Sequence, residues 1–199
     1  MKNIIIFLLP FVYNLCTSQT TFKDERLGFS IQQPKKWIVA EEGETVQNLK
    51  EHIKLDKTTL KKLIDTHKGT YQVVTFFKYP INSKYGVIPT IKIVLKNNGS
   101  ASFDDFKKSI EKSYMGIKDI FPDFRFTEKP TVKYVNDKKC VFAACDYTLT
   151  AHNGQEKVKL TVYALPINDS FYQITFMDSE KEDNSKLFEE ILKSIRIEE

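Results

Sequence analysis

Histidine, the side chain most often used to bind transition metals and to move protons, occurs three times and never in a pair. His52 and His67 fall in separate predicted helices, and His152 lies beside a predicted hairpin turn. None of them has a second histidine or a cysteine at ligand spacing, such as i,i+4 on a helix. We therefore interpret all three as ordinary surface or half-buried histidines and predict no metal site.

Two cysteines, Cys140 and Cys145, share one strand-like run over residues 139–150. Five residues of strand span about 16 Å, whereas a disulfide needs its Cα atoms within about 7 Å. The odd spacing also places the two side chains on opposite faces. We expect two free thiols, and a buried structural role for Cys145. Apolar and aromatic residues share its side of the strand: Val141, Ala143, Tyr147 and Leu149.

The sequence motifs of common enzymes do not occur in this chain. It has no G-x-S-x-G nucleophile motif, no P-loop and no dinucleotide fingerprint, and its 7 glycines are scattered. Acidic residues precede the last helix at Asp178, Glu180, Glu182 and Asp183, and the stretch 180–183 lacks the glycine and the ligand spacing of a calcium loop. We therefore predict no catalytic residues, no cofactor and no enzyme activity.

One loop between predicted strands is the candidate binding edge. Tyr79, Tyr85 and Val87 flank Pro80 and Gly86 there, and loops of this kind often carry recognition. The formal net charge is only +4, and the lysine pairs are separated and interleaved with acids. We predict no nucleic-acid partner.

The first eighteen residues have the parts of a secretory signal peptide. Lys2 supplies a positive start, residues 4–12 are almost wholly apolar, and Cys16-Thr17-Ser18 offers small side chains before Gln19. The apolar run is about half the roughly 20 residues of a membrane-spanning helix. We expect a signal peptide over 1–18, a single domain over 19–199 without a transmembrane segment, and a periplasmic or secreted location.

A lipoprotein anchor at Cys16 is the less favoured alternative. The preceding residues, Tyr13-Asn14-Leu15, are bulkier than the small residues that a lipoprotein peptidase prefers.

Hydrophobic periodicity predicts the elements that would position any site. Residues 90–96 alternate, with Ile91, Ile93 and Leu95 on one face and Thr90, Lys92 and Lys96 on the other. Four further strands form a meander, with a strong turn at Asn153-Gly154 and a weaker one at Asn136-Asp137. The predicted strands cover 27–33, 71–79, 90–96, 126–135, 139–150, 157–165 and 171–177, and the predicted helices cover 46–53, 56–69, 102–121 and 184–195.

An antiparallel sheet with helices packed on it is an α+β domain. The last helix shows the clearest amphipathic pattern, because its apolar residues recur at helical spacing. The apolar stripe of the last helix consists of Leu187, Phe188, Ile191, Leu192 and Ile195.

We interpret Trp37, which follows Pro34, as a lid on the core rather than a ligand-stacking residue.

Both ends of the predicted domain resemble the PsbP-like family. The run Leu27-Gly28-Phe29-Ser30-Ile31, followed by Pro34 and Trp37, is similar to its opening. The strand 171–176, an acidic loop and the helix 188–195 resemble its last strand and helix. The resemblance implies an α/β/α sandwich around an antiparallel sheet, in an exported protein. The plant member supports the oxygen-evolving centre of photosystem II, but nothing in this sequence points to photosynthesis.

The favoured function is a non-catalytic, exported binding or assembly-support protein of the cell envelope, with an envelope protein as its partner. The alternative is a hydrolase or an apolar-ligand carrier whose site is assembled from distant residues. An enzyme requires a cleft with convergent polar groups, and a carrier requires an enclosed apolar cavity.

Overall fold

The computed structural model describes residues 20–41, 70–83, 86–151 and 154–198. Several predicted features lie outside these residues: the signal peptide over 1–18, the helices over 46–53 and 56–69, the three histidines, and Tyr85.

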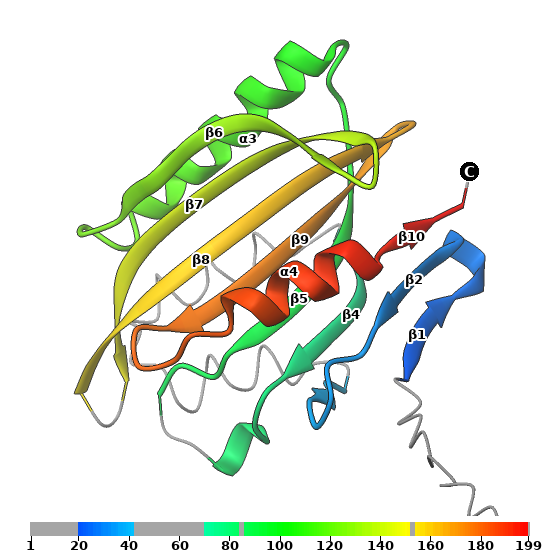
Figure 1. Ribbon diagram of the computed structural model, residues 1–199. Coiled ribbons are helices and arrows are strands. Elements are labelled where there is room, and N and C mark those ends of the chain that lie inside the picture. The colour runs from blue at the N-terminus through cyan, green and yellow to red at the C-terminus, as the bar shows by residue number, and fades with distance from the viewer. Residues whose placement is uncertain (1–19, 42–69, 84–85, 152–153, 199) are drawn as a thin grey trace, which may run out of the picture.

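A seven-stranded antiparallel sheet, in the order β3-β4-β5-β9-β8-β7-β6, forms the centre of the molecule (Figure 1). Every predicted strand beyond residue 70 is present in it. Its strands are β3 (Ile38–Val39), β4 (Tyr71–Phe77), β5 (Thr90–Asn97), β6 (Arg125–Val135), β7 (Lys138–Ala151), β8 (Gly154–Ile167) and β9 (Ser170–Ser179).

The meander from β6 to β9 is confirmed, and so is the predicted turn at Asn136-Asp137. Asn136 and Asp137, the weaker signal, have φ angles of 47° and 67°, which is the positive-φ pair of a type I′ turn. The strands β7 and β8 pair as far as Ala151 opposite Gly154. Gly154 is therefore the first residue of β8 rather than a turn residue, and Asn153, the other residue of the predicted turn, lies outside the described residues.

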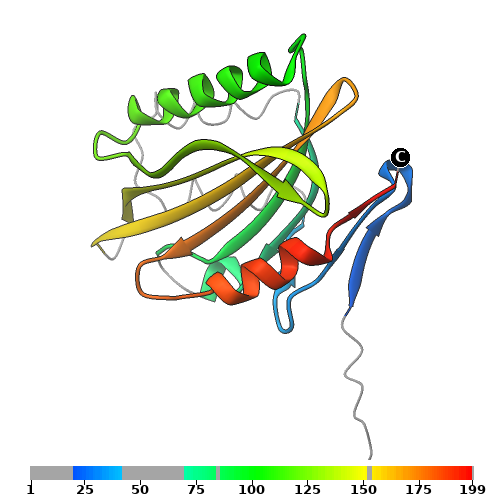
Figure 2. The same ribbon diagram turned by 45° about the horizontal axis from the view of Figure 1, so that its top comes forward.

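Two helices cover opposite faces of this sheet, α3 (Phe103–Lys118) and α4 (Ser185–Ser194) (Figure 2). The predicted start of α3 is confirmed, because the Ser102 hydroxyl accepts a hydrogen bond of 3.1 Å from the Asp105 amide. The helix ends at Lys118, before the predicted residue 121. The Ile120 and Phe121 amides both bond the Ile117 carbonyl and close the chain into a turn.

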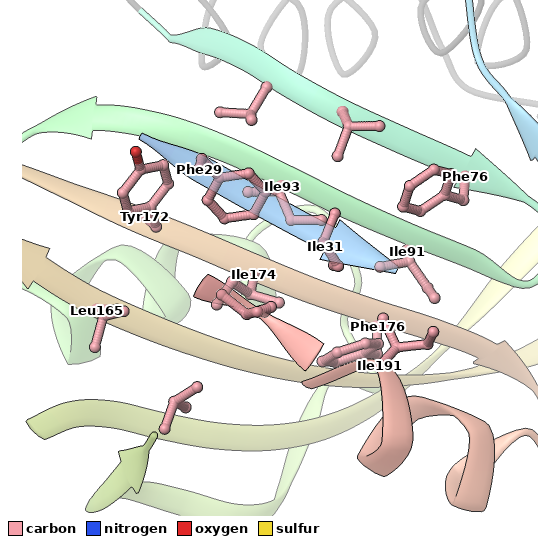
Figure 3. Close-up of a cluster of buried hydrophobic side chains, with 14 of the residues drawn as sticks. Phe29, Ile31, Phe76, Ile91, Ile93, Leu165, Tyr172, Ile174, Phe176 and Ile191 are labelled. Carbon is pink, nitrogen blue, oxygen red and sulfur yellow. The ribbon is translucent and has the colours of Figure 1, made fainter. Parts of the chain in front are cut away.

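The sheet separates two hydrophobic clusters, and the alternation of side chains along each strand determines which cluster each residue joins. The α4-side cluster lies between the sheet, α4 and strand β2 (Figure 3). The α3-side cluster lies between the sheet and α3, which contributes Phe106, Ile110 and Tyr114. Cys140 belongs to the first cluster and Cys145 to the second, both as free thiols, so the predicted separation of the cysteines is confirmed.

Helix α4 docks through the predicted stripe. Ile191 and Ile195 are 0% and 2% exposed, and the other stripe residues pack half-buried on the same cluster. Trp37 is buried as predicted, and its ring meets that of Phe188 edge-on at 6.2 Å between centroids. The Phe188 ring also lies 5.0 Å from that of Phe176 on β9.

A second, three-stranded sheet was not predicted as such: β1 (Thr21–Asp24), β2 (Phe29–Gln32) and β10 (Arg196–Ile197), in the order β1-β2-β10. Strand β2 starts at Phe29 rather than 27, because a 3-10 turn (Glu25–Leu27) ends at Gly28 with a φ of 56°. The Glu198 amide donates a 2.9 Å bond to the Gly28 carbonyl. A Cβ on Gly28 would lie 3.0 Å from the Glu198 carbonyl oxygen, so this crossing requires glycine.

Candidate functional site

The α3 side of the sheet changes from apolar to polar at β4, β5 and β9. Thr75, Lys92 and Thr175 lie directly opposite one another across these three strands. Directly paired residues share a face, so the three side chains form one row. The same row continues under α3 as Val162 on β8 and Ala143 on β7, both buried in the α3-side cluster.

A chain of hydrogen bonds extends this row. The Lys96 Nζ donates to the Gln173 Oε1 at 3.0 Å, and the Gln173 Nε2 donates to the Thr175 Oγ1 at 3.3 Å. Lys96 and Lys92 alternate with Ile91 and Ile93, which point to the other face of β5 and into the α4-side cluster. We call the five residues Thr75, Lys92, Lys96, Gln173 and Thr175 the polar patch.

The electrostatics of the polar patch are unusual for a protein surface. Burial, together with the smaller effect of the positive charge of Lys96, lowers the pKa of Lys92 to about 8. Burial also lowers the pKa of Lys96. In the part of the chain that the structure describes, neither ammonium group forms an ion pair with a carboxylate. Among the described residues, the patch therefore holds two half-buried cations that form no ion pair.

The Thr75 hydroxyl adds a second anomaly. Thr75 is 0% exposed, and among the described residues its Oγ1 is the buried side-chain polar atom that has no hydrogen-bond partner. Buried hydroxyl groups are nearly always satisfied, because leaving one unpaired is costly.

The carboxylates of the acidic stretch have structural partners. Asp178 is buried and accepts bonds from the Asn184 amide at 2.8 Å and from the Asn184 side chain at 2.9 Å, which fixes the start of α4. Glu182 bonds Lys78 and the Tyr79 hydroxyl. Among the described residues no group of three potential ligands could hold a metal ion.

A second ion pair joins the strands β6, β7 and β8. The Asp146 side chain is nearly buried and accepts a 2.6 Å bond from Arg125, and Lys157 lies 3.0 Å away. The hydrogen bond from Arg125 is the main cause that lowers the pKa of Asp146, and Lys157 adds to it.

The predicted binding loop is only partly available. Val87 is 2% exposed, its side chain joins the α3-side cluster, and its amide donates a 3.0 Å bond to buried Glu156. Val87 is thus a core residue, and the binding role of this loop stays a prediction. Tyr79 is half-buried and its hydroxyl lies 3.3 Å from Glu182, while Tyr85 is outside the described residues.

The two thiols are poor candidates for chemistry. Burial raises the pKa of Cys140 to about 11 and that of Cys145 to about 12. At neutral pH both are therefore protonated, whereas the thiolate is the nucleophile.

Grooves lined by described residues lie at the small sheet and beside β10. One, of about 280 Å³, lies beside β1 and β2 and has charged walls that include Lys23, Asp24 and Glu198. The other, of about 130 Å³, lies between Val135, Leu165 and β10. Pockets for drug-sized ligands hold roughly 300–1,000 Å³ and are mostly apolar, so neither groove suits a sizeable apolar ligand.

Sequence reasoning missed the polar patch, although part of its signal was visible. The alternation in 90–96 placed Lys92 and Lys96 on one face, which is usual for a strand with a solvated side. Only the register shows that β5 lies between β4 and β9, so that Lys92 has Thr75 on one side and Thr175 on the other.

Comparisons with known proteins identify the fold. No family model matches the chain, and no curated protein matches its sequence. The solution structure of cyanobacterial PsbP (CyanoP) from Synechocystis sp. PCC 6803 is similar, with a TM-score of 0.53 and 9% identity over 93% of this chain and 96% of that one. A crystal structure from Bacteroides thetaiotaomicron has a TM-score of 0.50 and 10% identity over 91% of this chain, which spans only 49% of that protein.

A weaker likeness is to LpqN of Mycobacterium tuberculosis, a protein involved in cell envelope biogenesis. Its TM-score is 0.48 at 9% identity, over 93% of this chain and 88% of that one. The likeness to CyanoP confirms the predicted PsbP-like α+β fold. None of the helices among the described residues is long and apolar enough to cross a membrane.

Proposed function

We propose that this chain, which has the PsbP-like fold, is a non-catalytic binding protein that is exported and engages a protein partner at the cell envelope. Its signal-peptide-like start supports export, and the fold is shared with CyanoP. Because a fold by itself does not carry function, the proposal depends on the site.

The polar patch is the observation that carries the proposal. Lys92 and Lys96 supply charge, Thr75 and Thr175 supply hydroxyl groups, and these groups are half-buried or buried on one sheet face. Such groups can hold a ligand. General acid–base catalysis would require in addition a carboxylate or imidazole within hydrogen-bond reach of the reacting group. The five residues of the patch include neither.

The alternatives make different demands on the structure. A hydrolase needs an activated nucleophile beside a base, yet the described thiols are buried and protonated. A carrier of apolar ligands needs a closed apolar cavity, and the two grooves described above are small or lined by charges. A binding protein makes neither demand.

Export is tested by mass spectrometry of the protein recovered from the source cells. We expect a mature chain that begins at Gln19, within about two residues, since signal peptidases cut after small residues. An intact Met1, or a diacylglyceryl group on Cys16, would contradict this.

Partner binding is tested by affinity capture with chemical crosslinking from an envelope extract, using the chain from Gln19 as bait. We expect one or a few envelope proteins to be enriched over an unrelated exported protein of similar charge. No enrichment after crosslinking would contradict the proposed function.

A further inference from the structure

We propose that the polar patch binds an oxyanion, a carboxylate or phosphate group of the bound partner, through Lys92 and the hydroxyl groups of Thr75 and Thr175. This inference rests on the proposed function, because it names the chemical group that the binding protein would take. The patch is separate from the buried carboxylate networks around Asp178 and Asp146.

The strand register places the required groups together. Thr75, Lys92 and Thr175 are direct partners on three adjacent strands. Strands in a sheet lie about 4.7–4.9 Å apart, and directly opposed Cβ atoms lie about 4.5–5.5 Å apart. A hydroxyl group therefore lies on each side of the Lys92 side chain. Thr175 is half-buried, whereas Thr75 is 0% exposed, so a ligand oxygen reaches the Thr75 hydroxyl only when the groups that cover it move.

The polar patch has more hydrogen-bond donors than free acceptors. The Gln173 carbonyl oxygen is used by Lys96, and the Thr175 oxygen accepts from the Gln173 amide. Among the hydrogen bonds of the described residues, none gives an acceptor to the Lys92 ammonium or to the Thr75 hydroxyl. An oxyanion offers only acceptors, so it complements this set.

Charge points to the same kind of ligand. Placing two ammonium groups on a half-buried face without a carboxylate is unfavourable, because burial removes hydration and the like charges repel. The described ion pairs elsewhere follow the usual rule: Asp146 is matched by Arg125 and Lys157. An oxyanion beside Lys92 would supply the missing negative charge.

The fully buried Thr75 hydroxyl is an observation independent of the lysines. A valine of nearly the same shape would fill this position in a strand without an unpaired polar atom. The hydroxyl has a physical reason to be there if a ligand oxygen accepts its proton.

The test uses the chain from Gln19, titrated separately with inorganic phosphate and with succinate, and observed by NMR chemical shifts and calorimetry. We expect saturable binding of at least one anion. The arm with the tighter binding identifies the source of the oxyanion, phosphate or carboxylate. Loss of one charge-assisted hydrogen bond should weaken binding by roughly tenfold, so we expect that effect for Lys92→Gln.

Two further variants complete the design. Thr75→Val should weaken binding several-fold without lowering the melting temperature, because it removes an unpaired hydroxyl and keeps the shape. Lys129→Gln, on the exposed edge strand β6, removes the same charge away from the patch and should leave affinity within about twofold. If Lys92→Gln does not fold, Thr75→Val carries the test.

Three outcomes would overturn the inference: no saturable binding of either anion by the parent, parental affinity in Lys92→Gln and Thr75→Val, or an equal loss in Lys129→Gln. If one of these outcomes is found and the protein still captures an envelope partner, the anion site is refuted but the proposed function is not. Anion binding without any captured partner contradicts the proposed function while supporting the site.

Discussion

Replacing Ile191 by alanine tests whether helix α4 closes the α4-side cluster. Ile191 is 0% exposed and belongs to the α4-side cluster, where its side chain points from α4 toward Phe176 (Figure 3). The substitution removes three carbons, worth roughly 2.4 kcal/mol at about 0.8 kcal/mol per buried CH₂. Substitutions of this type, with the cost of the cavity included, destabilise by roughly 2–5 kcal/mol in total.

Such a loss is a large share of the roughly 5–15 kcal/mol that stabilises a domain. Each kcal/mol shifts the melting temperature by about 2–4 °C in a protein of this size, so we expect a fall of roughly 4–20 °C. Thermal unfolding followed by circular dichroism and calorimetry measures it. Phe188→Ala should also destabilise, by roughly 2–4 kcal/mol, because its ring packs on Trp37 and Phe176.

Glu190→Ala is the matched control, since Glu190 is exposed on the same helix. Its effect should stay within about 0.5 kcal/mol. If Ile191→Ala unfolds like Glu190→Ala, α4 does not dock on the sheet and the assignment of the core is wrong.

Three other predictions follow from single sites. Gly28→Ala should destabilise the protein by roughly 1–2 kcal/mol, because the φ of Gly28 is 56° and an added Cβ would crowd a carbonyl oxygen. Gly116→Ala, in helix α3, should stabilise it by roughly 0.5–1 kcal/mol, because the added Cβ meets open space. Urea unfolding compares the two variants, and equal effects would contradict the geometry. Cys140 and Cys145 should react with a thiol reagent at pH 8 only after denaturation, and fast reaction of the native protein would be inconsistent with their burial. Because burial raises the pKa of both thiols in the folded state, the free energy of unfolding should fall as pH rises above about 9. Asp146→Asn should lower the free energy of unfolding by about 1 kcal/mol at pH 7. Because the folded-state pKa of Asp146 lies below 3.8, the difference in unfolding free energy between variant and parent should shrink as pH falls through and below that value. A constant difference between pH 7 and pH 2 would show that the charge of Asp146 does not contribute.

The parts of the fold that could be predicted are those encoded by a local repeat. The stripe that includes Ile191 and the alternation along β5 and β7 determine faces without any knowledge of the partners. Strands β1 and β10 could not be found this way. They have four and two residues, and β10 pairs with β2 from the other end of the sequence.

The candidate site was harder to predict from the sequence than the fold, because it depends on which residues become neighbours in the folded protein. The sequence places Val87 in a loop beside Gly86. In the structure its side chain is buried in the α3-side cluster, and its amide donates a hydrogen bond to Glu156 on β8. Lys92 reads as a solvated strand lysine until β4 and β9 are placed on either side. The sequence pattern indicates the face of a side chain but not what covers that face.

Quantitative capture of envelope partners by the parent and by two lysine variants tests binding through the polar patch most directly. The bait is the chain from Gln19, crosslinked in envelope extract and measured by mass spectrometry as the parent, Lys92→Gln and Lys129→Gln. We predict that the parent and Lys129→Gln enrich the same partner equally, and that Lys92→Gln recovers several-fold less of it. Equal recovery by all three proteins, or no partner enriched by the parent, would contradict binding at this patch.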